Sequence, residues 1–144
     1  MSAGRRVPWK GFEAIERVSQ GHANWRVFIA SGLPRSEVLG WIKAADVFVL
    51  NSHYEGLSHA LIEAMTIGTP VIATNAGGNK TLVVHEETGL LIPPGDDVSL
   101  LDALTVVANE PIAARKRALA AQNRMDDFSL PHMIDGTVEL LKSL

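Results

Sequence analysis

Cysteine is absent from this chain of 144 residues, so the sequence excludes disulfide bonds and any zinc site built from thiolates. No run of about 18 apolar residues occurs, and we therefore expect no membrane-spanning helix. The sequence also lacks a P-loop, a Gly-x-Ser-x-Gly elbow and a Gly-x-Gly-x-x-Gly fingerprint. Because the five histidines do not show the i, i+4 spacing of helical metal pairs, we expect neither a metal nor a cofactor.

The chain also has no excess of basic residues. The chain has 13 lysines and arginines against 16 acidic residues, and a net charge of −3 does not favour nucleic acid as the main partner. Its 47% hydrophobic and 20% charged residues are typical of a globular protein, and its length fits one domain over residues 1–144. Residues 1–8 contain no apolar segment of the signal-peptide kind, so we expect a cytoplasmic protein.

The stretch from Glu55 to Met65 predicts a loop followed by a helix. Ser58 is a typical N-cap residue, while Gly68 followed by Pro70 is typical of a helix end. Four apolar residues repeat at the spacing of one helix face, namely Leu57, Leu61, Ala64 and Met65.

Short apolar segments at 46–50 and 71–74 flank this helix and predict a parallel βαβ unit. In such units ligands bind beyond the carboxyl ends of the strands, and the N-terminus of the helix favours an anion such as a diphosphate. The carboxylates of Glu55 in the loop and Glu63 in the helix can both accept hydrogen bonds from a polyol. The alternative for Glu63 is a solvated helix residue.

The same patterns predict the other elements of an α/β fold, a Rossmann-like parallel sheet flanked by helices. We expect a helix capped by Ser36 whose residues Val38, Leu39, Trp41 and Ile42 are buried. Strands are expected at 25–30 and 89–95, the latter broken at Pro93, and helices at 12–18, 36–44, 81–86, 99–109, 111–126 and, after a break at 128–129, 131–144.

Two glycine-containing segments suit a phosphate or sugar ligand. Arg5 and Lys10 lie beside Gly4 and Gly11 in the basic opening segment, and an arginine fork binds phosphate well. The alternative is a solvated N-terminus. The turn at 77–78 contains two glycines and allows close approach to a ligand, although a Gly-Gly pair is usually only a turn.

Seven motifs in order carry a resemblance to a known family. They are Gly4-Arg5 with Lys10-Gly11, Gly32-Leu33-Pro34, residues 45–52, Glu55 with Glu63-Ala64-Met65 (two glutamates separated by seven residues, EX7E), residues 68–74, Gly77-Gly78, and residues 88–95. In this order they resemble the nucleotide-sugar-binding second domain of GT-B-fold glycosyltransferases of family 4, a large retaining group. The likeness covers nearly the whole chain.

The resemblance implies a site for the diphosphate of a nucleotide-sugar donor. Arg5 and Lys10 would pair with the phosphates, and Gly56, Leu57 and Ser58 would offer backbone amides to the phosphates or to the donor sugar. The reaction implied is glycosyl transfer with retention, assisted by stabilisation of the charge on the leaving diphosphate.

The remaining parts of the donor would fall to other residues. By the same resemblance, Glu55 would hold hydroxyls of the donor sugar, and with Arg5 and Lys10 it forms the catalytic set. Glu63 would accept the ribose hydroxyls, while Gly32 and Leu33 would flank the base.

The chain departs from the family pattern in three places. Residues 77–81 read Gly-Gly-Asn-Lys-Thr where the family commonly has Gly-Gly-x-Pro-Glu, so a carboxylate often found there is missing. Only three residues precede Gly4, where the family has a full strand. Residues 19–31 have room for one strand, whereas the family has two strands and a helix there, so we expect fewer strands than usual.

No acceptor-binding first domain is present in the sequence, so the chain is expected to be inactive alone, as a fragment or a truncated relative. A non-catalytic module that binds a nucleotide sugar or a partner is the alternative, and a Rossmann-like domain without a ligand is a third reading. Expected partners are the donor and an acceptor-binding domain. An incomplete sheet would also expose an edge that favours a homodimer.

Overall fold

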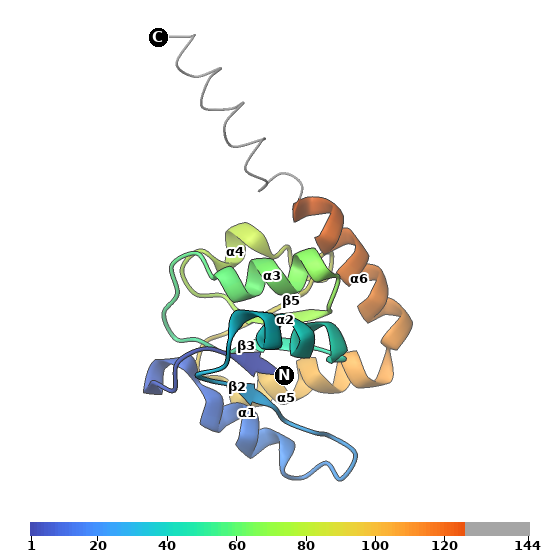
Figure 1. Cartoon of the computed structure of the whole chain (residues 1–144). Coiled ribbons are helices and arrows are strands. Elements are labelled where there is room, and N and C mark those ends of the chain that lie inside the picture. Colours follow the sequence, from blue (N-terminus) through green and yellow to red (C-terminus); the bar gives the residue numbers. More distant parts are fainter. Residues whose placement is uncertain (126–144) are drawn as a thin grey trace.

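The computed structural model describes residues 1–125 and shows an α/β fold with helices on both faces of parallel strands (Figure 1). The predicted break at 128–129 and the predicted helix at 131–144 lie outside the described residues.

The centre of the sheet consists of three parallel strands, β3 (Phe48–Leu50), β4 (Val71–Thr74) and β5 (Leu90–Ile92). β4 lies in the middle, with Phe48 opposite Val71 on one side and Ile72 opposite Leu90 on the other. All residues of β3 and β4 are buried, which explains why their sequences are continuous apolar runs rather than alternating patterns.

Two shorter parallel strands, β1 (Ser2–Ala3) and β2 (Ile29–Ala30), pair with each other beside β3. The Val49 N–H donates to the Met1 carbonyl oxygen at 2.8 Å, and the Met1 ammonium donates to the Val47 carbonyl oxygen at 2.9 Å. Met1 thus bonds to residues on either side of Phe48, which is the pattern of a parallel ladder. The strands therefore follow each other in the order β2, β1, β3, β4, β5.

The sequence predicted most of the helices that flank the sheet. α1 (Phe12–Ser19), α5 (Asp97–Asn109) and α6 (Pro111–Arg124) confirm the helices expected there, and α3 (His59–Ile67) confirms both predicted ends. The Ser58 hydroxyl accepts a hydrogen bond from the Leu61 N–H, and Gly68 ends the helix at φ +82°. The remaining helices are the short 3₁₀ turn η1 (Pro8–Lys10), α2 (Arg35–Ala44) and α4 (Asn79–Leu82).

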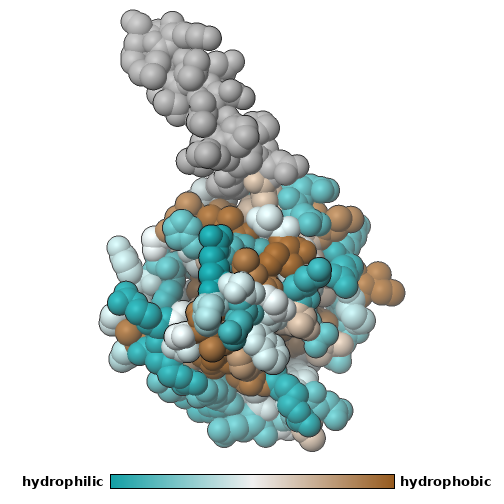
Figure 2. Space-filling view, in the orientation of Figure 1, coloured by the Kyte–Doolittle hydropathy of each residue, from teal (hydrophilic) through white to brown (hydrophobic). Residues whose placement is uncertain are grey.

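The alternation of strand residues divides the core into two layers. Phe48 and Ala73 face the cluster that includes residues of α2, α3 and α4, whereas Val49 and Ile72 face α1 and α5. α6 contributes Ala121 to the cluster that contains Phe48 and Ala114 to the cluster that contains Val49. This helix therefore covers the side of the sheet (Figure 1). Beyond these clusters, the face in Figure 2 mixes hydrophilic and hydrophobic side chains.

Two predictions for residues 25–41 are wrong. The strand expected at 25–30 contains only Ile29 and Ala30, because its partner β1 has just two residues and Trp25 stacks on His22 instead. Of the four residues of α2 expected to be buried, only Ile42 is. Val38 and Leu39 are partly exposed, and Trp41 is 46% exposed and stacks on Phe28.

Three further details correct the expected helices. α2 begins at Arg35, and Pro34 rather than Ser36 holds the N-cap position, with no side-chain capping bond. Leu57 precedes α3 and is 50% exposed, so it does not belong to the buried face. The helix expected at 81–86 is instead α4, which spans only Asn79–Leu82. Asn79 at its start is fully buried, and its side-chain amide donates to the Thr74 carbonyl oxygen.

Candidate functional site

The candidate site lies where β3 and β4 end. The loop 51–58 follows β3 and leads into α3, and the turn 75–78 follows β4. The Thr74 hydroxyl donates to the Ser52 carbonyl oxygen at 2.6 Å, which fixes the start of the loop to the end of β4. Both segments therefore meet at the edge where parallel α/β sheets bind ligands.

Two glycines seat the loop on the neighbouring turn. The Gly78 N–H donates to the carbonyl oxygen of Gly56 at 3.1 Å. A Cβ atom on Gly78 would lie 2.5 Å from that oxygen, and one on Gly77 would collide with the carbonyl oxygen of Glu55. The glycines expected to allow close approach of a ligand instead allow close approach of the backbone of residues 55–56. This contact fixes the position of Glu55 relative to the sheet.

The turn formed by η1 and Gly11 near the start of the chain also packs against this loop. Gly11 has φ +63°, and a side chain there would collide with the backbone of Asn51. The Asn51 amide donates to the Gly11 carbonyl oxygen at 3.1 Å, and the His53 N–H donates to the Trp9 carbonyl oxygen at 2.8 Å. η1 is therefore held against residues 51–53.

This arrangement brings Lys10 and Glu55 together, although 45 positions separate them in the chain. The Lys10 ammonium donates to Glu55 Oε2 at 2.6 Å, and the Ser52 hydroxyl donates to the same oxygen at 3.0 Å. The lysine and glutamate side chains are only 19% and 15% exposed. Since a carboxylate has about four acceptor positions, Glu55 keeps the capacity to bind hydroxyl groups.

Arg5 is exposed on the segment between β1 and η1, and within residues 1–125 its side chain makes no ion pair or hydrogen bond. Of the three predicted backbone donors, Gly56 and Leu57 are exposed while Ser58 is buried as the N-cap of α3. The structure thus places the residues 56–58 and Glu55 on one loop, and leaves Arg5 without a partner in the described part of the chain.

Glu63 lies in α3 and is not a freely solvated helix residue. Its side chain is 18% exposed, and its Oε1 accepts a hydrogen bond from Arg35 Nε at 2.7 Å. Arg35 opens α2, directly after the turn that contains Gly32 and Leu33. Gly32 has φ +72° and both turn residues are exposed. The ion pair therefore connects the turn predicted to flank a base with the glutamate predicted to bind ribose.

Sequence reasoning did not find Ser52 and Arg35. Ser52 ends the predicted strand three residues before Glu55, and a hydroxyl at that distance from a carboxylate is a usable signal. Arg35 had no signal, because its partner lies 28 residues away on another helix. Within residues 1–125, no group of three histidine, cysteine or acidic side chains could hold a metal ion. No helix in the same range is long and apolar enough to span a membrane.

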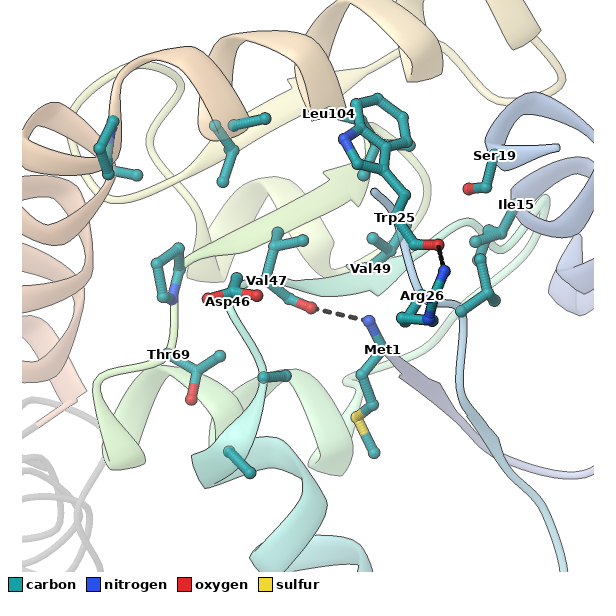
Figure 3. Close-up of a pocket in the computed structure, with 18 of the residues that line it drawn as sticks. Met1, Ile15, Ser19, Trp25, Arg26, Asp46, Val47, Val49, Thr69 and Leu104 are labelled. Atoms are coloured by element: carbon teal, nitrogen blue, oxygen red, sulfur yellow. Dashed lines mark hydrogen bonds between the residues drawn. The ribbon is translucent and has the colours of Figure 1, made fainter. Parts of the chain in front are cut away.

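A pocket in the described residues lies away from this site. It has a volume of about 800 Å³ and opens where β3 and β4 begin, at the opposite edge of the sheet (Figure 3). Its lining includes Trp25, Asp46, Thr69 and Leu104. We assign the site to the carboxyl ends, because the paired charges, the helix N-terminus and the glycine-seated loop converge there, whereas the pocket has no such set.

Comparisons with known proteins agree on one family. The sequence matches the family described as "Glycosyl transferases group 1" over residues 3–124. Glycogen synthase of Mycobacterium tuberculosis is 35% identical over 109 residues, which cover 75% of this chain and 26% of the relative. The UDP-Gal:alpha-D-GlcNAc-diphosphoundecaprenol alpha-1,3-galactosyltransferase of Escherichia coli is 40% identical over 106 residues, which cover 74% of this chain and 27% of the relative. The chain thus spans about a quarter of the length of these relatives.

Solved structures show the same fold. HepE from Anabaena, crystallised in complex with UDP, matches with a TM-score of 0.87 and 21% identity over 99% of this chain and 48% of its own. Sucrose-phosphate synthase from Thermosynechococcus elongatus matches with a TM-score of 0.75 and 30% identity over 98% of this chain and 37% of its own. The predicted fold class, a Rossmann-like parallel sheet flanked by helices as in GT-B glycosyltransferases, is confirmed.

Proposed function

Because the chain belongs to the group 1 glycosyltransferases, we propose that residues 1–144 form the donor-binding part of an enzyme that transfers a sugar from a nucleotide diphosphate sugar with retention. The observation that carries this proposal is the Lys10–Glu55 pair, which lies at the carboxyl edge of the sheet beside the N-terminus of α3. A cation, a helix N-terminus and a carboxylate in one place suit a ligand that has both phosphates and hydroxyl groups.

In this proposal, Lys10 and Arg5 bind the diphosphate. Lys10 is held against the loop, so its charge is already in place before a ligand arrives, and Arg5 keeps all its donors for phosphate oxygens. Gly56, Leu57 and Ser58 supply backbone amides at the start of α3, where the helix dipole favours an anion. These groups stabilise the negative charge that grows on the leaving diphosphate as the sugar departs.

The two glutamates divide the rest of the donor. Glu55 accepts hydrogen bonds from the donor-sugar hydroxyls and Glu63 from the ribose hydroxyls, while Gly32 and Leu33 flank the base. The different surroundings of the glutamates support this division, since Glu55 pairs with Lys10 in the loop and Glu63 pairs with Arg35 on α2. The UDP in the HepE crystals is the class of ligand that this arrangement suits.

We propose that the chain alone transfers no sugar, because the groups that bind an acceptor belong to a partner domain. Three large side chains next to the paired charges support a covering partner: Trp9, Tyr54 and Leu57 are 49%, 77% and 50% exposed. The homodimer and the cytoplasmic location expected from the sequence stay predictions. A non-catalytic nucleotide-sugar-binding module is the second candidate, which Thr81 favours because the family commonly has a glutamate there.

A thermal-shift panel of UDP, GDP, ADP and their sugar conjugates tests the proposal. A ligand that binds only the folded chain stabilises it by about 2.7 kcal/mol at a concentration of 100 Kd, which raises the melting temperature by roughly 5–10 °C for a domain of this size. We expect such a shift with one of the nucleotides and its conjugate. No shift with any member of the panel at millimolar concentration would reject the proposal.

A further inference from the structure

Arg35 is the residue that holds Glu63 in place. Its guanidinium donates through Nε to Glu63 Oε1 at 2.7 Å, and in residues 1–125 this is the one ion pair that Arg35 makes. The two partners differ strongly in exposure, at 77% for the arginine side chain and 18% for the glutamate. The arginine therefore reaches from the surface onto a carboxylate that is mostly buried.

This asymmetry shows which partner depends on the other. Arg35 would be well hydrated without the contact, whereas a mostly buried carboxylate needs a partner to replace the water it has lost. The contact is also unnecessary for docking α2 on α3, because Ile42 and Leu61 are both fully buried in the same cluster and the Thr69 hydroxyl donates to the Ile42 carbonyl oxygen at 2.9 Å. The main effect of the pair is thus on the orientation of Glu63.

The geometry leaves Glu63 able to bind a ligand. Arg35 donates through one nitrogen to one oxygen, so Glu63 Oε2 makes no hydrogen bond within the described residues. A carboxylate has about four acceptor positions, and a single N–H contact uses one of them. A guanidinium that holds one oxygen and leaves the other open fixes the direction in which the second oxygen accepts.

We propose that Arg35 is a positioning residue for the nucleoside of the donor: by holding Oε1 of Glu63, it directs the carboxylate to the two ribose hydroxyls. This inference rests on the proposed function, in which Glu63 binds ribose. It adds that discrimination between a ribonucleotide and a nucleotide without ribose hydroxyls depends on a residue that contacts neither hydroxyl. Arg35 directly follows the turn that contains Gly32 and Leu33, so it lies between the residues proposed to contact the base and the glutamate proposed to contact the ribose.

The test compares UDP with 2′,3′-dideoxy-UDP by calorimetry on the 144-residue chain; if GDP or ADP binds best, the matching pair is used. Arg35→Gln removes the charge, Arg35→Lys keeps it, and Arg17→Gln is the matched control. Arg17 is also an exposed arginine in an ion pair, but it joins α1 to Asp97 of α5, away from α2 and α3. Because Arg35 is exposed, all three variants should fold, which an unchanged melting temperature checks.

We expect Arg35→Gln to weaken binding of the ribonucleotide about three- to tenfold and to leave the dideoxynucleotide unchanged. Arg35→Lys should recover part of the loss, and Arg17→Gln should change neither ligand. Equal losses for both ligands would overturn the inference, since Arg35 would then contact another part of the nucleotide. Unchanged or tighter ribonucleotide binding would overturn it too. If the unaltered chain binds no nucleotide, the proposed function fails and this inference fails with it.

Discussion

Gly78 offers a clean way to move the candidate site without altering any of its side chains. The residue has φ −76°, so alanine fits its backbone without strain. A Cβ atom there would lie 2.5 Å from the Gly56 carbonyl oxygen, about 0.9 Å short of the 3.4 Å at which ordinary contact begins. Gly78→Ala must therefore push the loop 55–57 away from the sheet, and it also breaks the 3.1 Å hydrogen bond from the Gly78 N–H.

The expected result of Gly78→Ala is a loss of both stability and sugar-nucleotide binding. Overpacking of this kind costs about 1–3 kcal/mol of unfolding free energy. A displacement near 1 Å at Glu55 and the amides of residues 56–58 should weaken the sugar nucleotide about tenfold or more, because a hydrogen bond to a charged group is worth about 1.5–3 kcal/mol.

Urea unfolding and calorimetry on Gly78→Ala and on the control Gly40→Ala measure both effects. Gly40 lies in α2, and the Cβ atom that alanine adds there meets no atom within 4 Å outside the helix backbone, so this change should raise stability by about 0.5–1 kcal/mol and leave binding unchanged. Full stability and full binding in Gly78→Ala would refute the claim that the glycines seat the loop. A loss of stability with unchanged binding would show that the loop does not form the site.

Three further predictions concern the charges, the acceptor and the cap of α5. Lys10→Gln should weaken UDP about tenfold or more by calorimetry, while Lys43→Gln at the other edge of the sheet has no effect; equal binding by both variants would contradict the phosphate role. Sugar nucleotides incubated with the chain and any acceptor should give no glycosylated product by mass spectrometry, and sustained transfer would refute the need for a partner domain. Hydrogen bonds from the Ser99 backbone N–H and hydroxyl lower the pKa of Asp96, so its contribution is present above the unfolded-state pKa and is lost as pH falls through the folded-state value. Urea midpoints between pH 5 and pH 2 should therefore fall less steeply in Asp96→Asn, and identical slopes would be the contrary result.

The helix α3 shows how far the sequence could predict the fold. Ser58 and Gly68 mark its ends through local chemistry, a side-chain cap and a left-handed glycine, and neither depends on the rest of the protein. The buried strands β3 and β4 were similarly clear because continuous apolar runs need cover on both faces. By contrast, residues 25–28 have strand propensity but no partner long enough to pair with, so the tertiary context overrides it.

The position of the loop 51–58 after β3 was predicted from the sequence, whereas the ion pairs of its candidate residues were not. The glutamates stand out because each follows or lies within a recognisable element, and the position of their loop follows from the carboxyl-end rule. The contacts of Lys10 with Glu55 and of Arg35 with Glu63 join positions 45 and 28 residues apart, and no periodicity encodes such distances. Only the packing of η1 on the loop and of α2 on α3 brings these charges together.

The most direct test of the account separates the two glutamates by calorimetry with a free nucleoside diphosphate and its sugar conjugate. Glu63→Gln should weaken both ligands by about ten- to hundredfold, because both contain the ribose and a hydrogen bond to a charged group is worth about 1.5–3 kcal/mol. Glu55→Gln should weaken the sugar conjugate much more than the free nucleotide, because the glutamine amide oxygen can still accept the hydrogen bond that holds Lys10 beside the diphosphate. Equal losses for both ligands in Glu55→Gln, or no loss in either variant, would contradict the assignment of Glu55 to the sugar and Glu63 to the ribose.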